Sequence, residues 1–346
     1  MSSMNESKKS DNCEKSSKKT KIKSPLNKTL DMSIEDGKVY FKKCLDLRNE
    51  ENLDFYTKAD GKINFETIED KTICGESFDV MKKLPNGSFD LAIVDPPYNL
   101  TKDFGGKKFS QTSDSLYAEY TNEWLALLLP LLRTNGSLYI CCDWKSSIVI
   151  ASVLSEFEKN KRLFVRNRIT WQREKGRGAK SNWKNSMEDI WFCTLSDDYF
   201  FNLDAVKIRR KVIAPYKTNG IPKDWSETED GKFRDTCPSN FWDDISVPFW
   251  SMPENTAHPT QKPEKLIAKL ILASSKKDDV VFDPFLGSGT TSVTAKKLGR
   301  HFCGIELSEQ YCGWIEKRLE DAESNKTIQG YSDGVFWERN TGNFQK

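Results

Sequence analysis

A carboxylate, two prolines and an aromatic ring stand together in Asp95-Pro96-Pro97-Tyr98, directly after the mostly apolar run Phe89–Val94. Such a run predicts a buried strand, and the prolines end it because they cannot donate to a sheet. The Asp95 carboxylate and the Pro96 carbonyl can then both accept hydrogen bonds from a planar exocyclic amine, which localises the lone pair of its nitrogen for attack. Tyr98 offers a ring on which a base can stack. The motif predicts chemistry on the amine of a base, and a plain strand-ending turn with Asp95 as a helix cap is the alternative.

A glycine-rich turn is the second group of residues with a recognisable use. It follows the apolar run Val280–Asp283 and reads Asp-Pro-Phe-Leu-Gly-Ser-Gly-Thr over 283–290. Its two glycines let the backbone approach a ligand, and the helix expected at Thr291–Leu298 presents free N–H groups to that ligand. About 20 residues further on, the run His301–Glu306 ends in an acid suited to ribose hydroxyls. The turn lacks the third glycine of dinucleotide sites and the lysine of ATP sites, so it favours an adenosine cofactor without a phosphate cage, such as S-adenosylmethionine.

The composition excludes several classes of protein. The 346 residues carry 53 Lys and Arg against 51 Asp and Glu and are 37% hydrophobic, as in an ordinary globular protein. The longest apolar run, Trp124–Leu132, is far shorter than the roughly 20 residues that cross a bilayer, and no secretory signal precedes it, so we expect no membrane partner and a cytoplasmic location. Nine cysteines without a Cys-x-x-Cys pair indicate reduced thiols. Because His258 and His301 are the only histidines, we expect no metal site.

The alternation of short apolar runs with helical patterns predicts a mostly parallel α/β sheet. Besides the runs named above, we expect strands at Ser137–Cys142, Val165–Trp171 and Asp189–Thr194. We also expect a helix over Pro263–Ser275, with the proline in its first position and one apolar face. Ligands of such sheets bind at the carboxyl ends of the strands, so the two motifs are expected to face one another there.

In this combination and order, the two motifs resemble those of the permuted β class of DNA amino-methyltransferases, the N-4/N-6 DNA methylases. Three further segments match the family: Gly136–Ile140, Ile169–Trp171 and the hexapeptide His258–Pro263. The resemblance spans roughly residues 71–321. It implies a Rossmann-like S-adenosylmethionine-dependent methyltransferase fold of the α/β class. That fold has a seven-stranded, mostly parallel sheet with one antiparallel strand, and here it carries an inserted, loop-rich recognition module.

The resemblance also implies roles for individual residues. The catalytic residues would be Asp95, Pro96, Pro97 and Tyr98. The cofactor-binding residues would be Glu76, Thr260, Gln261, Lys262, Asp283, Phe285, Gly287, Ser288, Gly289, Thr290 and Glu306. Among these, Glu306 would take the ribose and residues 260–262 would reach the amino-acid part of the cofactor. Glu76 stands where the family often has an aspartate, so an extra methylene would meet the adenine.

A basic segment near the predicted recognition module points to nucleic acid. Residues 161–184 hold nine Lys and Arg against one acid. Such residues give affinity for phosphates, while Arg, Asn and Gln read base edges. The candidate contacts to double-stranded DNA are Arg173, Arg177, Asn182 and Lys184. A solvated basic face is the alternative for any one of them.

The predicted organisation has six parts. They are a disordered basic tail (1–30), an N-terminal extension (31–70), a catalytic half (71–171), a target-recognition region (172–257), a cofactor-binding half (258–325) and a C-terminal tail (326–346). In the family, Asp in the first motif position mostly accompanies adenine-N6 methylation and Ser mostly cytosine-N4 methylation, so adenine is the expected target. Cytosine-N4 methylation, or a non-catalytic DNA-binding partner of the same fold, is the alternative. We expect a bacterial, nucleoid-associated monomer or homodimer, which a restriction endonuclease for the same site would accompany.

Overall fold

The computed structural model describes residues 24–104, 107–173, 181–212, 216–228 and 231–339. Its main sheet is nine-stranded, in the spatial order β1-β2-β16-β15-β3-β6-β8-β7-β14. In that order the strands are β1 (Leu45–Asp46), β2 (Lys71–Cys74), β16 (His301–Glu306), β15 (Val280–Asp283), β3 (Phe89–Val94), β6 (Leu132–Asp143), β8 (Met187–Thr194), β7 (Phe164–Gln172) and β14 (Phe241–Trp242). Neighbours run parallel, except that β8 is antiparallel to both β6 and β7. Apart from the two-residue edge strands β1 and β14, this is the predicted seven-stranded sheet with one antiparallel strand, and the fold class is confirmed.

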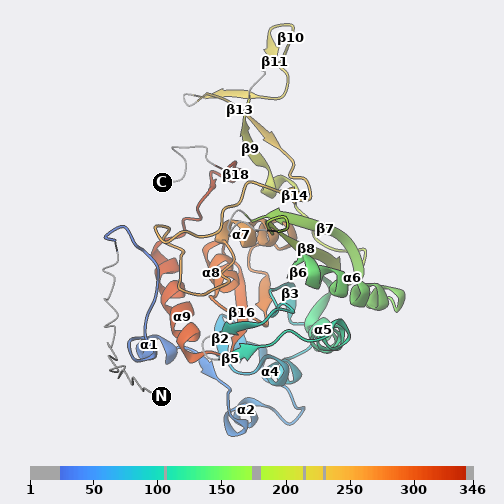
Figure 1. Ribbon diagram of the computed structural model, residues 1–346, viewed down its shortest axis with the longest axis vertical. Coiled ribbons are helices and arrows are strands. Elements are labelled where there is room, and N and C mark those ends of the chain that lie inside the picture. The colour runs from blue at the N-terminus through green and yellow to red at the C-terminus, as the bar shows by residue number, and fades with distance from the viewer. Residues whose placement is uncertain (1–23, 105–106, 174–180, 213–215, 229–230, 340–346) are drawn as a thin grey trace, which may run out of the picture.

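Helices cover both faces of the main sheet, because alternate residues of its strands point to opposite sides. One face carries α4 (Ser77–Lys83), α5 (Asp114–Leu128) and α6 (Trp144–Lys159), and the other carries α7 (Glu264–Ser274), α8 (Thr290–Lys297) and α9 (Glu309–Ser324). Within β3, Ala92 and Val94 join the first apolar core, while Leu91 and Ile93 join the second. The result is a three-layer sandwich (Figure 1). Burial on both faces explains why the strands read as nearly continuous apolar runs.

Polar caps begin the helices around the carboxyl edge of the sheet. Ser113, Asp143 and Ser308 each accept a hydrogen bond from the backbone N–H three residues on, at the starts of α5, α6 and α9. Pro263, expected as the first residue of a helix, instead precedes α7 in an extended conformation with ψ at 141°. These ends fix the loops that shape the site.

The N-terminal segments belong to the folded body. Within the predicted disordered tail, residues 24–30 lie on the segment around 250–256, where the Lys28 N–H donates to the Trp250 carbonyl and the Leu30 N–H to the Asn255 carbonyl. The predicted tail boundary is therefore wrong for these residues, because they satisfy backbone groups of a distant loop. The preceding residues lie outside the described ranges.

The predicted N-terminal extension is likewise part of the main fold. Its helix α1 (Ile34–Phe41) packs on α9 so closely that a Cβ on Gly313 would lie 3.2 Å from the Gly37 carbonyl oxygen. Its strand β1 pairs with β2, and the short helices α2 (Glu50–Tyr56) and α3 (Phe65–Ile68) lie between the two strands in the chain. Figure 1 shows α1 beside α9.

A second sheet joins the recognition region to the C-terminal segment, in the order β12-β13-β9-β18-β17. Its strands are β12 (Ser226–Thr228), β13 (Gly231–Thr236), β9 (Ile208–Lys211), β18 (Val335–Trp337) and β17 (Tyr331–Ser332). Because β18 pairs in parallel with β9 and Phe336 is fully buried, the described part of the predicted C-terminal tail is a structural element. The region 172–257 is also less loop-rich than predicted, and its β8 and β14 belong to the main sheet.

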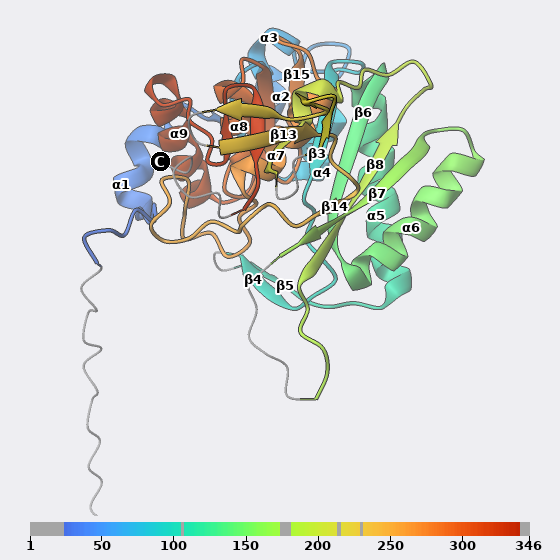
Figure 2. The same ribbon diagram turned by 90° about the horizontal axis from the view of Figure 1, so that it is seen from above.

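Two hairpins and two single turns of 3₁₀ helix complete the described elements. They are β4 (Lys102–Phe104) with β5 (Lys107–Phe109), β10 (Lys217–Thr218) with β11 (Ile221–Pro222), η1 (Leu129–Leu131) and η2 (Asp204–Val206). Asn219 and Gly220 take positive φ at the turn between β10 and β11, as a tight hairpin requires. The hairpin of β10 and β11 stands far from the main sheet in Figure 1. The hairpin of β4 and β5 lies near the edge of the main sheet in Figure 2. None of the described helices has the length and apolar character to cross a membrane.

Candidate active site

Three acids meet in a cavity at the carboxyl edge of the main sheet. Asp95 follows β3, Asp283 ends β15 and Glu306 ends β16. Because β15 pairs in parallel with both β3 and β16, the three carboxyl ends lie side by side. All three side chains line one cavity of about 630 Å³. The expectation that the two motifs face one another at this edge is confirmed.

Nearly all of the predicted catalytic and cofactor-binding residues line this cavity. Those that do are Glu76, Asp95, Pro96, Pro97, Tyr98, Thr260, Gln261, Lys262, Asp283, Phe285, Gly287, Ser288, Thr290 and Glu306. Gly289 is the exception. A Cβ at this position would lie 2.6 Å from Cγ1 of Ile315 on α9, and its φ is +80°. Gly289 therefore packs against α9. By comparison, a Cβ on Gly287 would lie 3.2 Å from the His258 ring, which also lines the cavity.

The two acids beside the glycine-rich turn organise it, with Asp283 buried and Glu306 partly buried at the cavity wall. Asp283 accepts hydrogen bonds from the Thr291 hydroxyl (2.7 Å) and the Phe285 N–H (3.0 Å). Glu306 accepts from the N–H groups of Gly287 (2.9 Å) and Ser308 (2.7 Å). Burial raises the pKa of both carboxyls to about 7, and these hydrogen bonds only partly oppose it. A cationic ligand in the cavity would favour their ionised forms.

Two other predicted ligands already serve the local structure. The Glu76 carboxylate accepts from the N–H groups of Phe78 (2.8 Å) and Asp79 (3.1 Å) and so caps α4. The Gln261 amide accepts from the Thr256 N–H at 2.8 Å and closes its own loop. Both side chains border the cavity, and their contact with a cofactor stays a prediction.

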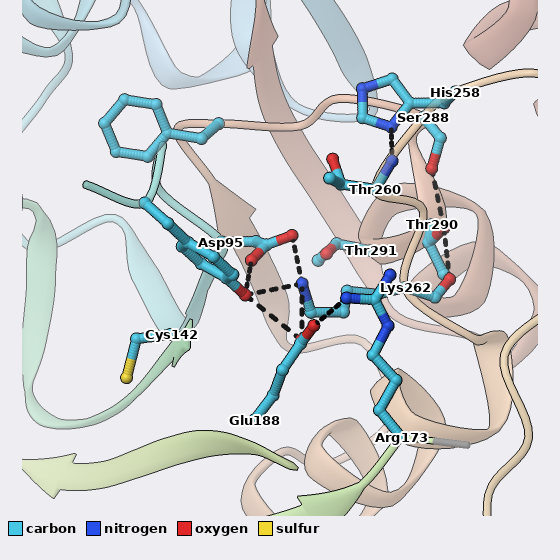
Figure 3. A network of polar contacts seen from close by, with 12 residues as sticks. Asp95, Cys142, Arg173, Glu188, His258, Thr260, Lys262, Ser288, Thr290 and Thr291 are labelled. Atoms are coloured by element: carbon cyan, nitrogen blue, oxygen red, sulfur yellow. Dashed lines mark hydrogen bonds and ion pairs between the residues drawn. The ribbon is translucent and has the colours of Figure 1, made fainter. Parts of the chain in front are cut away.

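Lys262 lies at the predicted catalytic motif, beside Asp95 and Tyr98. Its Nζ is 2.6 Å from Oδ2 of Asp95 and 2.9 Å from the Tyr98 hydroxyl, which itself donates to Oδ1 of Asp95 at 2.8 Å. Figure 3 shows the side chains of Asp95 and Lys262 pointing toward one another. The lysine, predicted to reach the amino-acid part of the cofactor, thus holds the Asp95 carboxylate in this structure.

Glu188 is a buried acid of the site that the sequence reading missed. It lies near the start of β8, with its Oε2 3.3 Å from the Tyr98 hydroxyl and 3.4 Å from Nζ of Lys262. Its Oε1 accepts from Nη1 of Arg173 at 2.6 Å. Arg173, predicted as a DNA contact, therefore pairs with an acid of the site (Figure 3). The only signal in the sequence was an acid at the head of an apolar strand.

Two of the remaining predicted DNA contacts lie on the surface before β8. Asn182 and Lys184 are exposed, and Arg177 lies outside the described residues. Between the two exposed residues, Trp183 has 91% of its surface exposed. An indole so accessible to solvent is a candidate for stacking on nucleic acid that sequence reading did not single out.

The cavity fits S-adenosylmethionine. Its volume of about 630 Å³ lies within the range of roughly 300–1,000 Å³ typical of cofactor sites. Its wall combines apolar groups such as Phe78 and Phe285 with the acids Asp283 and Glu306. A cofactor that carries a sulfonium and an ammonium group complements such acids. The fold and the cavity are those of a Rossmann-like enzyme for this adenosine cofactor.

The chain is similar to several known proteins. A family model described as DNA methylase matches residues 89–317. The Type II methyltransferase M.HpaI of Haemophilus parainfluenzae is 33% identical, over 75% of this chain and 76% of that protein. The DNA adenine methyltransferase YhdJ of Escherichia coli (strain K12) is 32% identical, over 80% of this chain and 91% of that protein. The crystal structure of the M1.HpyAVI–SAM complex matches with a TM-score of 0.48 and 24% identity, over 72% of this chain and 98% of that one.

The chain belongs to the N-4/N-6 DNA methylase family. It is a DNA methyltransferase, and S-adenosylmethionine is its cofactor. The resemblance inferred from the motifs is confirmed.

Proposed function

We propose that this protein methylates the N6 amine of adenine within a specific DNA sequence, on a base flipped out of the duplex. The observation that carries the proposal is the Asp95 carboxylate, held in the cavity wall by Lys262 and Tyr98 beside the cofactor-binding turn. An aspartate in this motif position favours adenine over cytosine, and the relative YhdJ is named a DNA adenine methyltransferase.

The catalytic motif acts by hydrogen bonding and positioning. Asp95 and the Pro96 carbonyl accept from the two N–H groups of the amine, which withdraws its lone pair from the ring and aims it at the methyl group. When bound, the cofactor would supply that methyl group: its C–S bond would break as the N–C bond forms, S-adenosylhomocysteine would leave, and the methylated nitrogen would lose one proton. Burial, together with Asp95 and Glu188, raises the pKa of Tyr98, so its hydroxyl stays protonated and donates to Asp95. The ionised Asp95 also offsets the positive charge that develops on the nitrogen.

Different segments of the chain would bind different parts of the cofactor. The turn at 283–290 would face the methionine part, and Thr260, Gln261 and Lys262 would reach its amino-acid group. Glu306 would accept from the ribose hydroxyls. Glu76, at the opening of α4, would meet the adenine ring. Asp283 and Glu306 hold the turn through their own hydrogen bonds, so cofactor binding and turn geometry depend on the same side chains.

We assign recognition of the DNA sequence to residues 172–257, together with the C-terminal strands paired to them. Asn182, Lys184 and Trp183 offer an exposed polar, basic and aromatic surface on the segment before β8. Relatives named Type II methyltransferases favour a restriction-modification system with an endonuclease for the same site. Such an enzyme works on bacterial DNA in the cytoplasm, as a monomer or homodimer.

The proposal is tested by nucleoside analysis. Unmethylated bacterial genomic DNA is incubated with labelled S-adenosylmethionine and the protein, digested and separated by mass. N6-methyladenine in one sequence context supports the proposal, and N4-methylcytosine assigns the alternative base. Bound cofactor and bound DNA without any methylated nucleoside would instead indicate a non-catalytic DNA-binding partner.

A further inference from the structure

Glu188 is placed to share Lys262 with the catalytic carboxylate. Its side chain is 6% exposed and that of Lys262 is 8% exposed, so both charges need partners inside the protein. Nζ of Lys262 lies 2.6 Å from Asp95 and 3.4 Å from Glu188, closer to the first acid than to the second. Burial alone would lower the pKa of Lys262, but the two carboxylates outweigh burial and hold that pKa above its usual range. The lysine therefore stays charged between two acids.

The charged ammonium group stands where the substrate must bind. Lys262 occupies Oδ2 of Asp95 and Tyr98 occupies Oδ1, and the incoming amine has to hydrogen-bond the same carboxylate. If Asp95 were the only acid near the lysine, leaving it would strand a buried charge, at a cost of several kcal/mol by typical values. A second acid within reach removes this penalty. Glu188 is that acid.

We propose that Glu188 is a positioning residue that receives Lys262 when the amine of the target base engages Asp95. The lysine moves from the nearer acid toward the farther one, and the Asp95 oxygen becomes free for the amine. This inference rests on the proposed amine methylation, whichever base carries the amine. It assigns Glu188 a role that acts through Lys262 and that requires no contact with DNA or cofactor.

Arg173 fixes the position of the receiving acid. Its Nη1 holds Oε1 of Glu188 at 2.6 Å, and its backbone N–H donates to the Ser186 carbonyl at 2.6 Å. Oε2, the oxygen nearer to Lys262, is thereby aimed at the lysine. With Asp95, Glu188, Lys262 and Arg173 all charged, the group is neutral, so the lysine can change partners without a change of net charge in the site.

The first test is a double-mutant cycle on the rate of a single turnover. Glu188→Gln is compared with the wild type and, separately, in a Lys262→Met background, at saturating cofactor and DNA. We expect Glu188→Gln to slow methyl transfer about tenfold or more in the wild type and less than about twofold once Lys262 is absent, because coupled residues are not additive. The cofactor dissociation constant, measured by calorimetry, should stay within about twofold, since Glu188 does not line the cofactor cavity.

Controls separate this role from a structural one. Asp189→Asn removes the next acid on β8, which bonds the Thr170 hydroxyl at 2.8 Å, and should leave the rate unchanged. Glu188→Asp should recover part of the lost rate, because it restores a charge for the lysine. Equal losses from Glu188→Gln in both Lys262 backgrounds, or no loss at all, would overturn the proposal. A wild type that transfers no methyl group to DNA would instead overturn the proposed function.

A binding measurement gives an answer even if Lys262→Met abolishes turnover. Duplexes that carry the target base or the same base without its exocyclic amine are titrated with S-adenosylhomocysteine-bound protein. The wild type should gain affinity from the amine, and Glu188→Gln should lose most of that gain, since the amine can no longer displace the lysine. An unchanged ratio of the two affinities in Glu188→Gln contradicts the proposal.

Discussion

The affinity for S-adenosylmethionine should rise with pH across neutrality, because ionised Asp283 would attract the cationic methionine part and ionised Glu306 would accept more strongly from the ribose hydroxyls. Asp283 and Glu306 have pKa values raised to about 7 by burial, so at pH 6 both are largely protonated. A carboxyl of pKa 7 is about one tenth ionised at pH 6 and about three quarters ionised at pH 7.5. Binding that requires one ionised carboxylate therefore strengthens about eightfold over this interval, and binding that requires both strengthens about 70-fold. The α-amino group of the cofactor, with an ordinary pKa near 7.7–8.0, stays mostly protonated over this range.

Calorimetric titration at pH 6.0, 6.5, 7.0 and 7.5, at constant ionic strength, measures this dependence. Glu306→Gln and Asp283→Asn should each remove one titrating carboxyl, so the affinity of either variant should rise less steeply with pH than that of the wild type. The neutral side chain keeps the shape of the acid and some of its hydrogen bonds. Proton release on binding, seen as a dependence of the heat on the buffer, should accompany the effect below pH 7. An affinity that stays level or falls between pH 6.0 and 7.5 would refute the role given to these acids.

Three further substitutions test the packing and the DNA surface. Gly289→Ala should lower the free energy of unfolding by about 1–3 kcal/mol in chemical denaturation, because its Cβ would lie 2.6 Å from Cγ1 of Ile315; unchanged stability would contradict this packing. Asp244→Asn should lower it by about 3–5 kcal/mol, since it leaves two buried lysines of α7 without their acid; a loss under about 1 kcal/mol contradicts that pairing. Trp183→Ala should weaken binding of a cognate duplex by about 1–3 kcal/mol in fluorescence anisotropy and leave cofactor affinity unchanged; equal DNA affinity removes the indole from the interface.

The parts of the site that could be predicted are those formed by residues that are contiguous in the sequence. Phe89–Val94, Val280–Asp283 and His301–Glu306 coincide with β3, β15 and β16, because strands buried on both faces give unbroken apolar runs. The turns that follow them carry prolines, glycines and acids whose uses are local. Parallel pairing then brings the carboxyl ends together without further information.

The parts that could not be predicted depend on contacts between distant segments. β18 has three residues and pairs with β9 far earlier in the chain, so nothing in Val335–Trp337 itself indicates the second sheet. The same holds for Lys262 and Asp95, which are 167 residues apart. Glu188 needed both the antiparallel placement of β8 and the position of Arg173 to become recognisable as part of the site. Spacing in the sequence carries none of these relations.

The measurement that tests the central claim most directly compares methyl transfer by the wild type and by Asp95→Ala. Both proteins are given labelled S-adenosylmethionine and unmethylated bacterial genomic DNA, and modification-sensitive sequencing locates the product. We expect the wild type to deposit N6-methyladenine in one sequence context and Asp95→Ala, although it still binds the cofactor, to deposit none. Methylation at the wild-type rate by Asp95→Ala would contradict the role of this carboxylate, and the absence of any methylated DNA base with the wild type would contradict the function itself.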